Sequence, residues 1–260
     1  MTMLNAIAAE LRKLVLLPSA LVATVLGTGL TLVLTATSMA SRRTKLDGGM
    51  PEDGLTLNLI LEMPAIGVIG VIVLGVVVIG SEYTPTTKDA GGGRQIAVSL
   101  TATPNRGVLL AAKAIVLALV SGVLASVTVG AGILISLALL GSHAGSPGEV
   151  LAALGWRPAG AVAYWVLTAL IAFAVTVMTR NGVVPMVVFI VNTSVVSVSF
   201  LLSRVTSLAK YLPDVAGAQM FARNYPVEVR SEPLVGGLIM AAWAAVLLAV
   251  AAGVFIRRDA

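Results

Sequence analysis

The sequence contains no cysteine, one histidine and few charged residues. The absence of cysteine excludes disulfides and thiolate metal sites, and His143 alone cannot build a site of several histidines. Charged residues make up 11% of the 260 positions, against about 25% in a typical soluble domain. With 58% hydrophobic residues and a mean hydropathy of +1.00, too little polar surface remains to cover a water-soluble globule. The composition therefore predicts an integral membrane protein.

Motifs of nucleotide and metal chemistry are also missing. The sequence has no GxxxxGK[ST] phosphate loop and no HExxH zinc motif. The stretch DAGGGRQ, Asp89–Gln95, lacks the lysine and the following Ser/Thr of a phosphate loop. Glu62 and Glu82 stand at opposite ends of one apolar run, too far apart to act as a catalytic pair. We expect no enzymatic activity, no metal and no cofactor in this chain.

The net charge of +5 does not indicate nucleic-acid binding. Lysines and arginines are scattered among apolar runs and are not clustered with aromatic residues. A positive charge with this distribution suits contact with anionic lipid headgroups or with an acidic face of a partner protein.

Six apolar runs are long enough to cross a bilayer core of about 30 Å as helices. None alternates in polarity as the strands of a membrane barrel do, so the sequence predicts an all-α polytopic membrane protein with a single transmembrane domain over residues 1–260. The third run exceeds one crossing, which predicts a tilted or projecting helix. The runs cover residues 19–40, 59–81, 108–140, 160–179, 182–203 and 234–256.

Residues 1–17 have a different pattern. Apolar residues recur at helical spacing, whereas the charged residues fall elsewhere and are not arranged as in a signal peptide. This predicts an amphipathic helix that lies in the membrane interface and ends at Pro18. The alternative is that these residues form the first turns of the following span. The apolar positions are Leu4, Ile7, Ala8, Leu11, Leu14 and Val15.

The connectors between the runs do not orient the protein. Six spans place both termini on one side of the membrane. Of the 17 lysines and arginines, nine fall on the side of the termini and eight on the other side, so the positive-inside rule gives almost no preference. The connectors 141–158 and 204–233, which lie on the side opposite the termini, contain short apolar patches. We expect short helices on the membrane surface there, with plain surface loops as the alternative.

Polar residues inside the runs are few and regularly spaced. Thr24, Thr28, Thr31 and Thr35 are separated by four, three and four positions and share one face of a helix. Asn192 and Ser199, seven positions apart, also share a face. These residues either hold helices together or line a weakly polar pathway. Lys113, near the start of the third run, is expected to extend to the headgroups.

One local motif carries a resemblance to a known family. The second run ends in GSEY, Gly80–Tyr83, and the end of the loop 82–107 and the start of the third run read RQIAVSLTATPNRGVLLAAKAIV, Arg94–Val116. The order is Glu-Tyr, then Leu-x-x-x-Pro-x-Arg, then a lysine at the start of the third run. Together with the N-terminal helix and the six runs, this resembles the membrane subunit of ABC-2-type exporters. The loop before Leu100 is longer here than in many members of that family.

The resemblance implies a fold and a set of partners. Loop 82–107 would be cytoplasmic and would hold a coupling helix at about residues 94–103, ended by Pro104, that docks in a groove of a separate ATPase subunit. Both termini would be in the cytoplasm of a bacterial cell, with the chain in the plasma membrane. Two permease chains, as a homodimer, would work with two ATPase chains that bind ATP and Mg. The implied coupling residues are Glu82, Tyr83, Arg94, Gln95, Leu100, Pro104 and Arg106.

The implied mechanism is alternating access, with the first and fifth spans at the interface between the two permease chains. Thr24, Thr28, Thr31, Thr35, Asn192 and Ser199 would line or seal that interface. A largely apolar interface suits an amphipathic or lipophilic cargo, such as a drug, a natural product or a lipid-like molecule. The alternative function is a membrane protein that binds a ligand without transporting it, as a sensor or an immunity protein.

Overall fold

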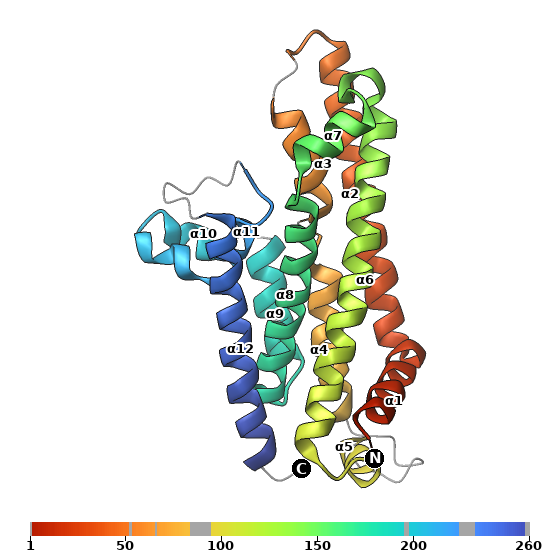
Figure 1. The fold of residues 1–260 in the computed structure, drawn as a ribbon, viewed down its shortest axis with the longest axis vertical. Coiled ribbons are helices and arrows are strands. Elements are labelled where there is room, and N and C mark those ends of the chain that lie inside the picture. The colour runs from red at the N-terminus through yellow and green to blue at the C-terminus, as the bar shows by residue number, and fades with distance from the viewer. Residues whose placement is uncertain are drawn as a thin grey trace.

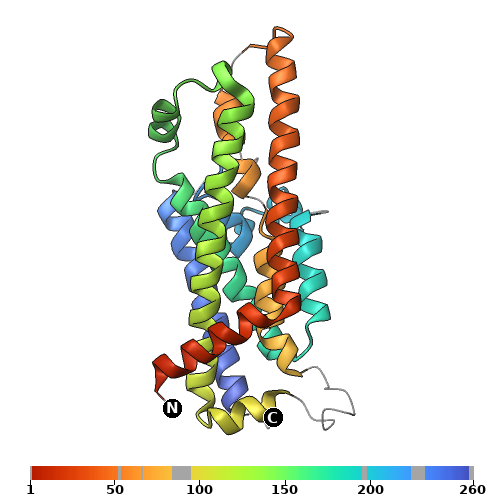
Figure 2. The same ribbon diagram turned by 90° about the vertical axis from the view of Figure 1, so that its right-hand side faces the viewer.

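The fold is an elongated bundle of helices. A computed structural model describes residues 2–51, 54–65, 67–83, 95–194, 198–223 and 232–257, and these segments contain helices and no strand. The long helices stand side by side, and α1 lies obliquely across one end of the bundle (Figures 1 and 2). The elements are α1 (Met3–Leu16), α2 (Pro18–Asp47), α3 (Gly54–Ala65), α4 (Ile69–Tyr83), α5 (Gln95–Ala102), α6 (Arg106–Leu140), η2 (Gly141–Ala144), α7 (Pro147–Leu154), α8 (Arg157–Thr179), α9 (Val183–Ser194), α10 (Val198–Ser203), η3 (Ser207–Tyr211), α11 (Pro213–Ala218) and α12 (Pro233–Arg257).

Within the described residues, five helical stretches are long and apolar enough to cross a membrane: Pro18–Asp47, Gly54–Tyr83, Arg106–Ala144, Arg157–Thr179 and Pro233–Arg257. The prediction of a helical membrane protein is therefore confirmed. Of the predicted fifth span, 182–203, the structure describes two helices, α9 and α10, on either side of residues 195–197, which lie outside the described part. The apolar helix Val183–Asn192 is shorter than a full crossing.

The predicted second span, 59–81, needs a correction. It begins earlier, at Gly54, and is divided into α3 and α4. The division follows Pro64, which interrupts the hydrogen-bond ladder of a helix. The backbone around the break is satisfied from neighbouring helices: Trp165 donates its indole N–H to the carbonyl of Ala65 at 2.7 Å, and Thr31 donates to the carbonyl of Gly67 at 3.3 Å. Backbone polar groups at membrane depth require such partners.

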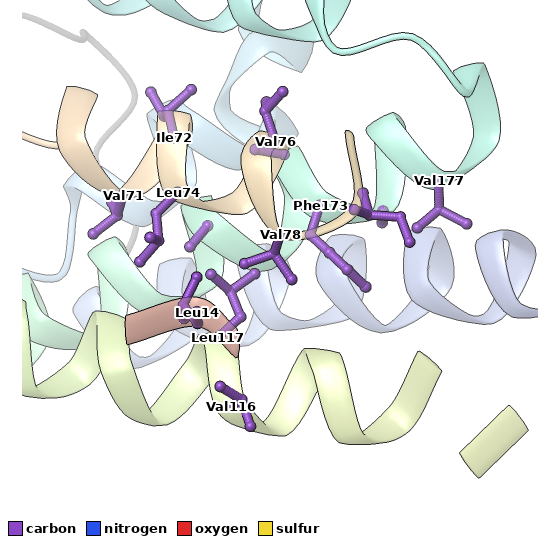
Figure 3. Close-up of a cluster of buried hydrophobic side chains, with 14 of the residues drawn as sticks. Leu14, Val71, Ile72, Leu74, Val76, Val78, Val116, Leu117, Phe173 and Val177 are labelled. Carbon is purple, nitrogen blue, oxygen red and sulfur yellow. The ribbon is translucent and has the colours of Figure 1, made fainter. Parts of the chain in front are cut away.

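Helix α4 lies at the centre of the bundle and contacts α2, α6, α8 and α9. Ten of its 15 residues are buried and none is exposed, which explains its nearly continuous apolar sequence. Figure 3 shows Leu74 and Val78 of α4 beside Leu14 of α1 and Leu117 of α6. The core therefore joins the oblique N-terminal helix to the long helices.

Small residues let α2 and α4 approach closely. A Cβ atom added at Gly27 would lie against the Cα of Gly70, closer than real Cβ atoms come. One turn further along α2, the side chain of Thr31 occupies the space beside Gly67. Close backbone approach through small residues is a common basis of helix association in membranes, because lipid supplies no hydrophobic driving force between helices.

The two ends of the bundle differ. Helices α1 and α5 and the C-terminal end of α12 lie at the same end, whereas α7 and the turn between α2 and α3 lie at the other (Figure 1). Helix α6 has 35 residues, about 52 Å at about 1.5 Å per residue. This length exceeds a bilayer core of about 30 Å, as expected from its sequence.

The helices expected in the connectors are present. Helix α7 lies in the connector 141–158, and η3 and α11 lie in the connector 204–233. The N-terminal region also forms a helix of its own, α1, which ends at Leu16. Pro18 then begins α2 rather than merely ending α1, in keeping with the preference of proline for the first turn of a helix.

Candidate functional site

A buried cluster of charged residues joins four helices at the end of the bundle that holds α1 and α5. Glu82 of α4 and Lys113 of α6 are 0% and 1% exposed. The ammonium of Lys113 lies 2.7 Å from Glu82 Oε1 and 2.6 Å from Oε2 of Glu10 in α1. Lys13 of α1 also pairs with Glu82. Two carboxylates and two ammonium groups thus balance in formal charge, which buried ions require.

Helix α5 is tied to this cluster through a hydroxyl. Ser99 Oγ accepts a hydrogen bond from Lys13 at 3.2 Å and donates one to Glu82 Oε2 at 2.9 Å. Each oxygen of the Glu82 carboxylate therefore has a partner from another part of the chain. Charge-assisted hydrogen bonds are stronger than neutral ones. The hydrogen bond from Ser99 to the Glu82 carboxylate therefore anchors the short helix α5 to the bundle.

The charged cluster has no room for a ligand. The cavity beside Glu10, Lys13 and Lys113 has a volume of about 10 Å³, space for one water molecule. We therefore assign these residues a positioning role, in which they fix α1 and α5 relative to α4 and α6.

The prediction that Lys113 extends to the headgroups is wrong. Its side chain is buried and turns inward to Glu10 and Glu82, and its ammonium also lies 3.5 Å from the carbonyl of Val78. A lysine so close to a membrane interface reaches water when it lacks an internal partner. Here two carboxylates offer a stronger alternative, and they lie 103 and 31 positions away in the sequence.

Two other residues of the motif also contact elements of this chain. The guanidinium of Arg180, in the turn between α8 and α9, lies 5.6 Å from the ring centroid of Tyr83. Arg106, at the start of α6, donates to the carbonyl of Phe255 near the end of α12 at 3.4 Å. Hence Glu82, Tyr83 and Arg106 together connect α4, α6 and α12 with the short elements at this end.

Helix α5 has one buried and one exposed face. Ile96 is 2% exposed and Leu100 packs against the core, whereas Val98 is 69% exposed. Gln95 is half-buried and Pro104 is exposed, two residues after the helix ends. Arg94 lies outside the described residues. The exposed face consists of Ala97, Val98, Thr101 and Ala102.

The four threonines of α2 face the interior of this chain. Thr31 and Thr35 are buried, and each donates to the carbonyl four residues earlier, at 2.7 and 2.8 Å. Thr28 accepts a hydrogen bond from Thr128 of α6 at 3.4 Å, and Thr24 is half-buried. In this conformation the threonines hold α2 against its neighbours. The exposed face of α2 is apolar and includes Leu21, Val22, Val25, Leu26, Leu30, Val33 and Leu34.

Asn192 of α9 and Ser199 of α10 line a pocket whose other lining residues belong to α8, α9, α11 and α12. Its volume is about 550 Å³, within the range of about 300–1,000 Å³ for small-molecule sites. Asn192 donates from Nδ2 to Oδ2 of Asp214 in α11 at 2.9 Å. The rest of the lining is mainly apolar, with Ile171, Val187, Val188 and Met240 among its residues. The two residues expected to share a face thus meet in one pocket.

Several residues of these two sites were not predicted from the sequence. Glu10 and Lys13 are separated by three positions and so share a face of α1, a signal that could have marked them as a pair directed at the bundle. Ser99 and Asp214 gave no such signal, because their partners come from distant segments.

The sequence matches no protein-family model and no curated protein. The function must therefore be inferred from the residues and their arrangement.

Proposed function

We propose that this chain is the permease subunit of an ATP-driven exporter of the ABC-2 type. In this proposal the end with α1, α5 and the end of α12 faces the cytoplasm of a bacterium, and the full chain crosses the plasma membrane six times. A separate ATPase subunit, present in two copies, binds ATP and Mg and hydrolyses the nucleotide. Two copies of the permease form the transport pathway, by which an amphipathic or lipophilic cargo leaves the cytoplasm or the inner leaflet.

The observation that carries the proposal is the attachment of α5. This helix has eight residues, too few to be stable alone, yet it is held by Ile96, by Leu100 and by the hydrogen bond from Ser99 to Glu82. Its outer face remains exposed. A short helix that packs against the long helices on one face and is exposed on the other can transmit a displacement caused by a partner protein to the bundle.

The charged cluster would transmit a displacement of α5 to the long helices. Glu82 belongs to the central helix α4, and Lys113 to α6, so a displacement of α5 acts on both through charged contacts. Glu10 and Lys13 bring α1 into the same unit. We infer that α1, α5 and the adjacent ends of α4 and α6 move together when the ATPase closes on ATP.

Co-purification with the ATPase tests this function. The ATPase candidate is the product of a neighbouring gene that carries Walker and signature motifs. The wild-type chain is compared with a chain in which residues 95–102 are replaced by a Gly/Ser linker of equal length. We expect the wild type to form a complex that hydrolyses ATP and the replaced chain to lose its partner. Equal behaviour of the two chains would contradict the proposal.

A second function is favoured by the pocket between α8, α9, α11 and α12. A pocket of about 550 Å³ suits a protein that binds a ligand without moving it, such as a sensor or an immunity protein. This alternative predicts ligand binding by the chain alone and no association with an ATPase, so the same co-purification separates the two.

A further inference from the structure

The chain exposes a surface of apolar side chains where α10 is followed by η3. Leu201 and Leu202 of α10, Val205 between the two helices, and Leu208 and Tyr211 of η3 are all exposed. The exposed fractions of Val205 and Leu208 are 83% and 69%. We call these five residues the α10–η3 surface. Large exposed apolar surfaces mark places where a protein meets a partner or a membrane.

The depth of this surface follows from its attachment to α12. Trp243 of α12 donates its indole N–H to the carbonyl of Tyr211 at 2.7 Å, and η3 packs against α10, α11 and α12. Trp243 lies about 15 Å along α12 from Pro233, at about 1.5 Å per residue. Helix α12 carries no charged residue from Leu234 to Ile256. Hence η3 lies beside the apolar length of α12 and not beyond its end.

This position places the α10–η3 surface against lipid. Helix α12 is one of the helices long and apolar enough to cross a membrane. In Figure 1, α10 and α11 lie beside the end of α12 that begins at Pro233, far from α1 and α5. The surface therefore meets the leaflet remote from α1 and α5, close to the headgroups of that leaflet.

Lys210 gives the surface a positive charge. The sequence from Val198 to Pro213 contains Arg204 and Lys210 and no acidic residue. The ammonium of Lys210 lies 5.0 Å from the centroid of the Tyr211 ring, and in the described part of the chain no carboxylate forms an ion pair with it. An ammonium at this depth needs an anion or water, and a lysine side chain is long enough to reach the headgroups.

We propose that the α10–η3 surface binds an anionic phospholipid, with the headgroup phosphate at Lys210 and the acyl chains along Val205 and Leu208. A zwitterionic lipid carries the same phosphate, but its own ammonium group compensates that charge and leaves none to balance Lys210. The site goes beyond the export function and does not require it, because every protein group that contacts the lipid belongs to this chain.

The test measures which lipid lies next to η3. The chain has no cysteine, so Leu208→Cys supplies a single thiol for the neutral fluorophore NBD, and the replaced side chain is largely exposed. The labelled chain is reconstituted without an ATPase in nanodiscs of phosphatidylcholine. Quenching is compared between small equal amounts of phosphatidylglycerol and phosphatidylcholine that carry the same doxyl-labelled acyl chain. We expect phosphatidylglycerol to be enriched about fivefold, the effect of one lysine near an anionic lipid surface.

Variants assign the preference to Lys210. Lys210→Gln, combined with Leu208→Cys, should make the two lipids quench equally, whereas Lys210→Arg should keep the preference. Val25→Cys is the matched control in lipid: it lies on the apolar face of α2 and is 67% exposed, and the two lipids should quench it equally. Lys45→Cys, at the end of α2 beyond its apolar face, is the aqueous control and should be quenched by neither.

Three results would overturn the proposal. If neither lipid quenches the label at Leu208→Cys, the surface does not face the bilayer. If both lipids quench it equally, no anionic lipid is selected, and this result needs no second substitution. If Lys210→Gln keeps the preference, Lys210 does not hold the headgroup. None of these results bears on the exporter proposal, because no ATPase is present.

Discussion

The carboxylate of Glu82 has partners from three other helices: Lys13 of α1, Ser99 of α5 and Lys113 of α6. Its complete burial makes these partners necessary, because an uncompensated charge in a buried site costs several kcal/mol. A single glutamate thereby determines how four elements meet. Its neighbour Tyr83 extends the connection to Arg180.

The charge balance of the cluster predicts how the effects of substituting Glu82 and Lys113 combine in a double variant. Glu82→Gln leaves an excess positive charge and Lys113→Met an excess negative one, and each should destabilise the fold by about 3–5 kcal/mol. The double variant retains Glu10 and Lys13, a neutral pair, and should be destabilised by clearly less than the sum of the single effects.

Thermal unfolding of the purified variants in detergent, followed by fluorescence, measures this cycle. The control is Asp47→Asn, whose exposed carboxylate pairs with His143 at the other end of the bundle and whose removal should matter little. Strict additivity of the two single effects would contradict the assignment of Glu82 and Lys113 to one cluster.

At the scale of the element, the packing of α2 on α4 depends on Gly27. A leucine there would meet the backbone of Gly70, which cannot move aside. We expect Gly27→Leu to lower the melting temperature markedly, since overpacking costs typically about 1–3 kcal/mol and more where backbone is involved. Gly29→Leu is the matched control on the same helix, because a Cβ at Gly29 meets nothing within 4 Å. Equal melting temperatures for the two variants would show that α2 and α4 do not pack in this way.

The attachment of α5 gives a second prediction at this scale. Ile96→Ala removes its most buried side chain, which in cores costs about 2–5 kcal/mol, and should detach the helix without unfolding the bundle. Hydrogen–deuterium exchange should then accelerate in residues 95–102 and stay unchanged in α8. The control Val98→Ala alters an exposed side chain and should leave the exchange of α5 at the wild-type rate. If exchange in α5 is already fast in the wild type, the helix is not anchored as described.

The elements differ in how far the sequence predicts them. Long apolar runs mark α2, α6, α8 and α12 without ambiguity, because only a membrane helix needs about 20 consecutive apolar residues. Helix α5 follows from Pro104, which ends it, together with the family resemblance. The break between α3 and α4 was missed because the run remains apolar through Pro64, and the donor that stabilises the break, Trp165, is 100 positions from Ala65.

For the residues of the candidate sites, local spacing predicts which side chains share a helix face but not which partners they meet. Asn192 and Ser199, which helical spacing places on one face, lie on two helices, α9 and α10, and both line the pocket. The threonines of α2 also share a face, but spacing cannot tell which neighbour that face meets. The structure places Thr31 and Thr35 against elements of the same chain. The burial of Lys113 depends on a tertiary arrangement that brings Glu10 of α1 beside α6, and no local pattern encodes it.

At the scale of the whole molecule, one end of the bundle gathers α1, α5 and the end of α12 (Figures 1 and 2), whereas the pocket is lined in part by residues of α9. The first region is packed and charged and suits the transmission of force. The second is hollow and largely apolar and suits a ligand. The proposed exporter would need such separate regions for energy input and for ligand contact.

The most direct test of the central claim is a cross-link between α5 and the ATPase. The chain has no cysteine, so Val98→Cys places a single thiol on the exposed face of α5. Leu151→Cys is the control, since Leu151 is 55% exposed on α7 at the opposite end of the bundle. With a thiol-linked photo-cross-linker, the account predicts a product that contains the ATPase for Val98→Cys and none for Leu151→Cys. No cross-link from Val98→Cys, or an equal yield from both positions, would contradict it.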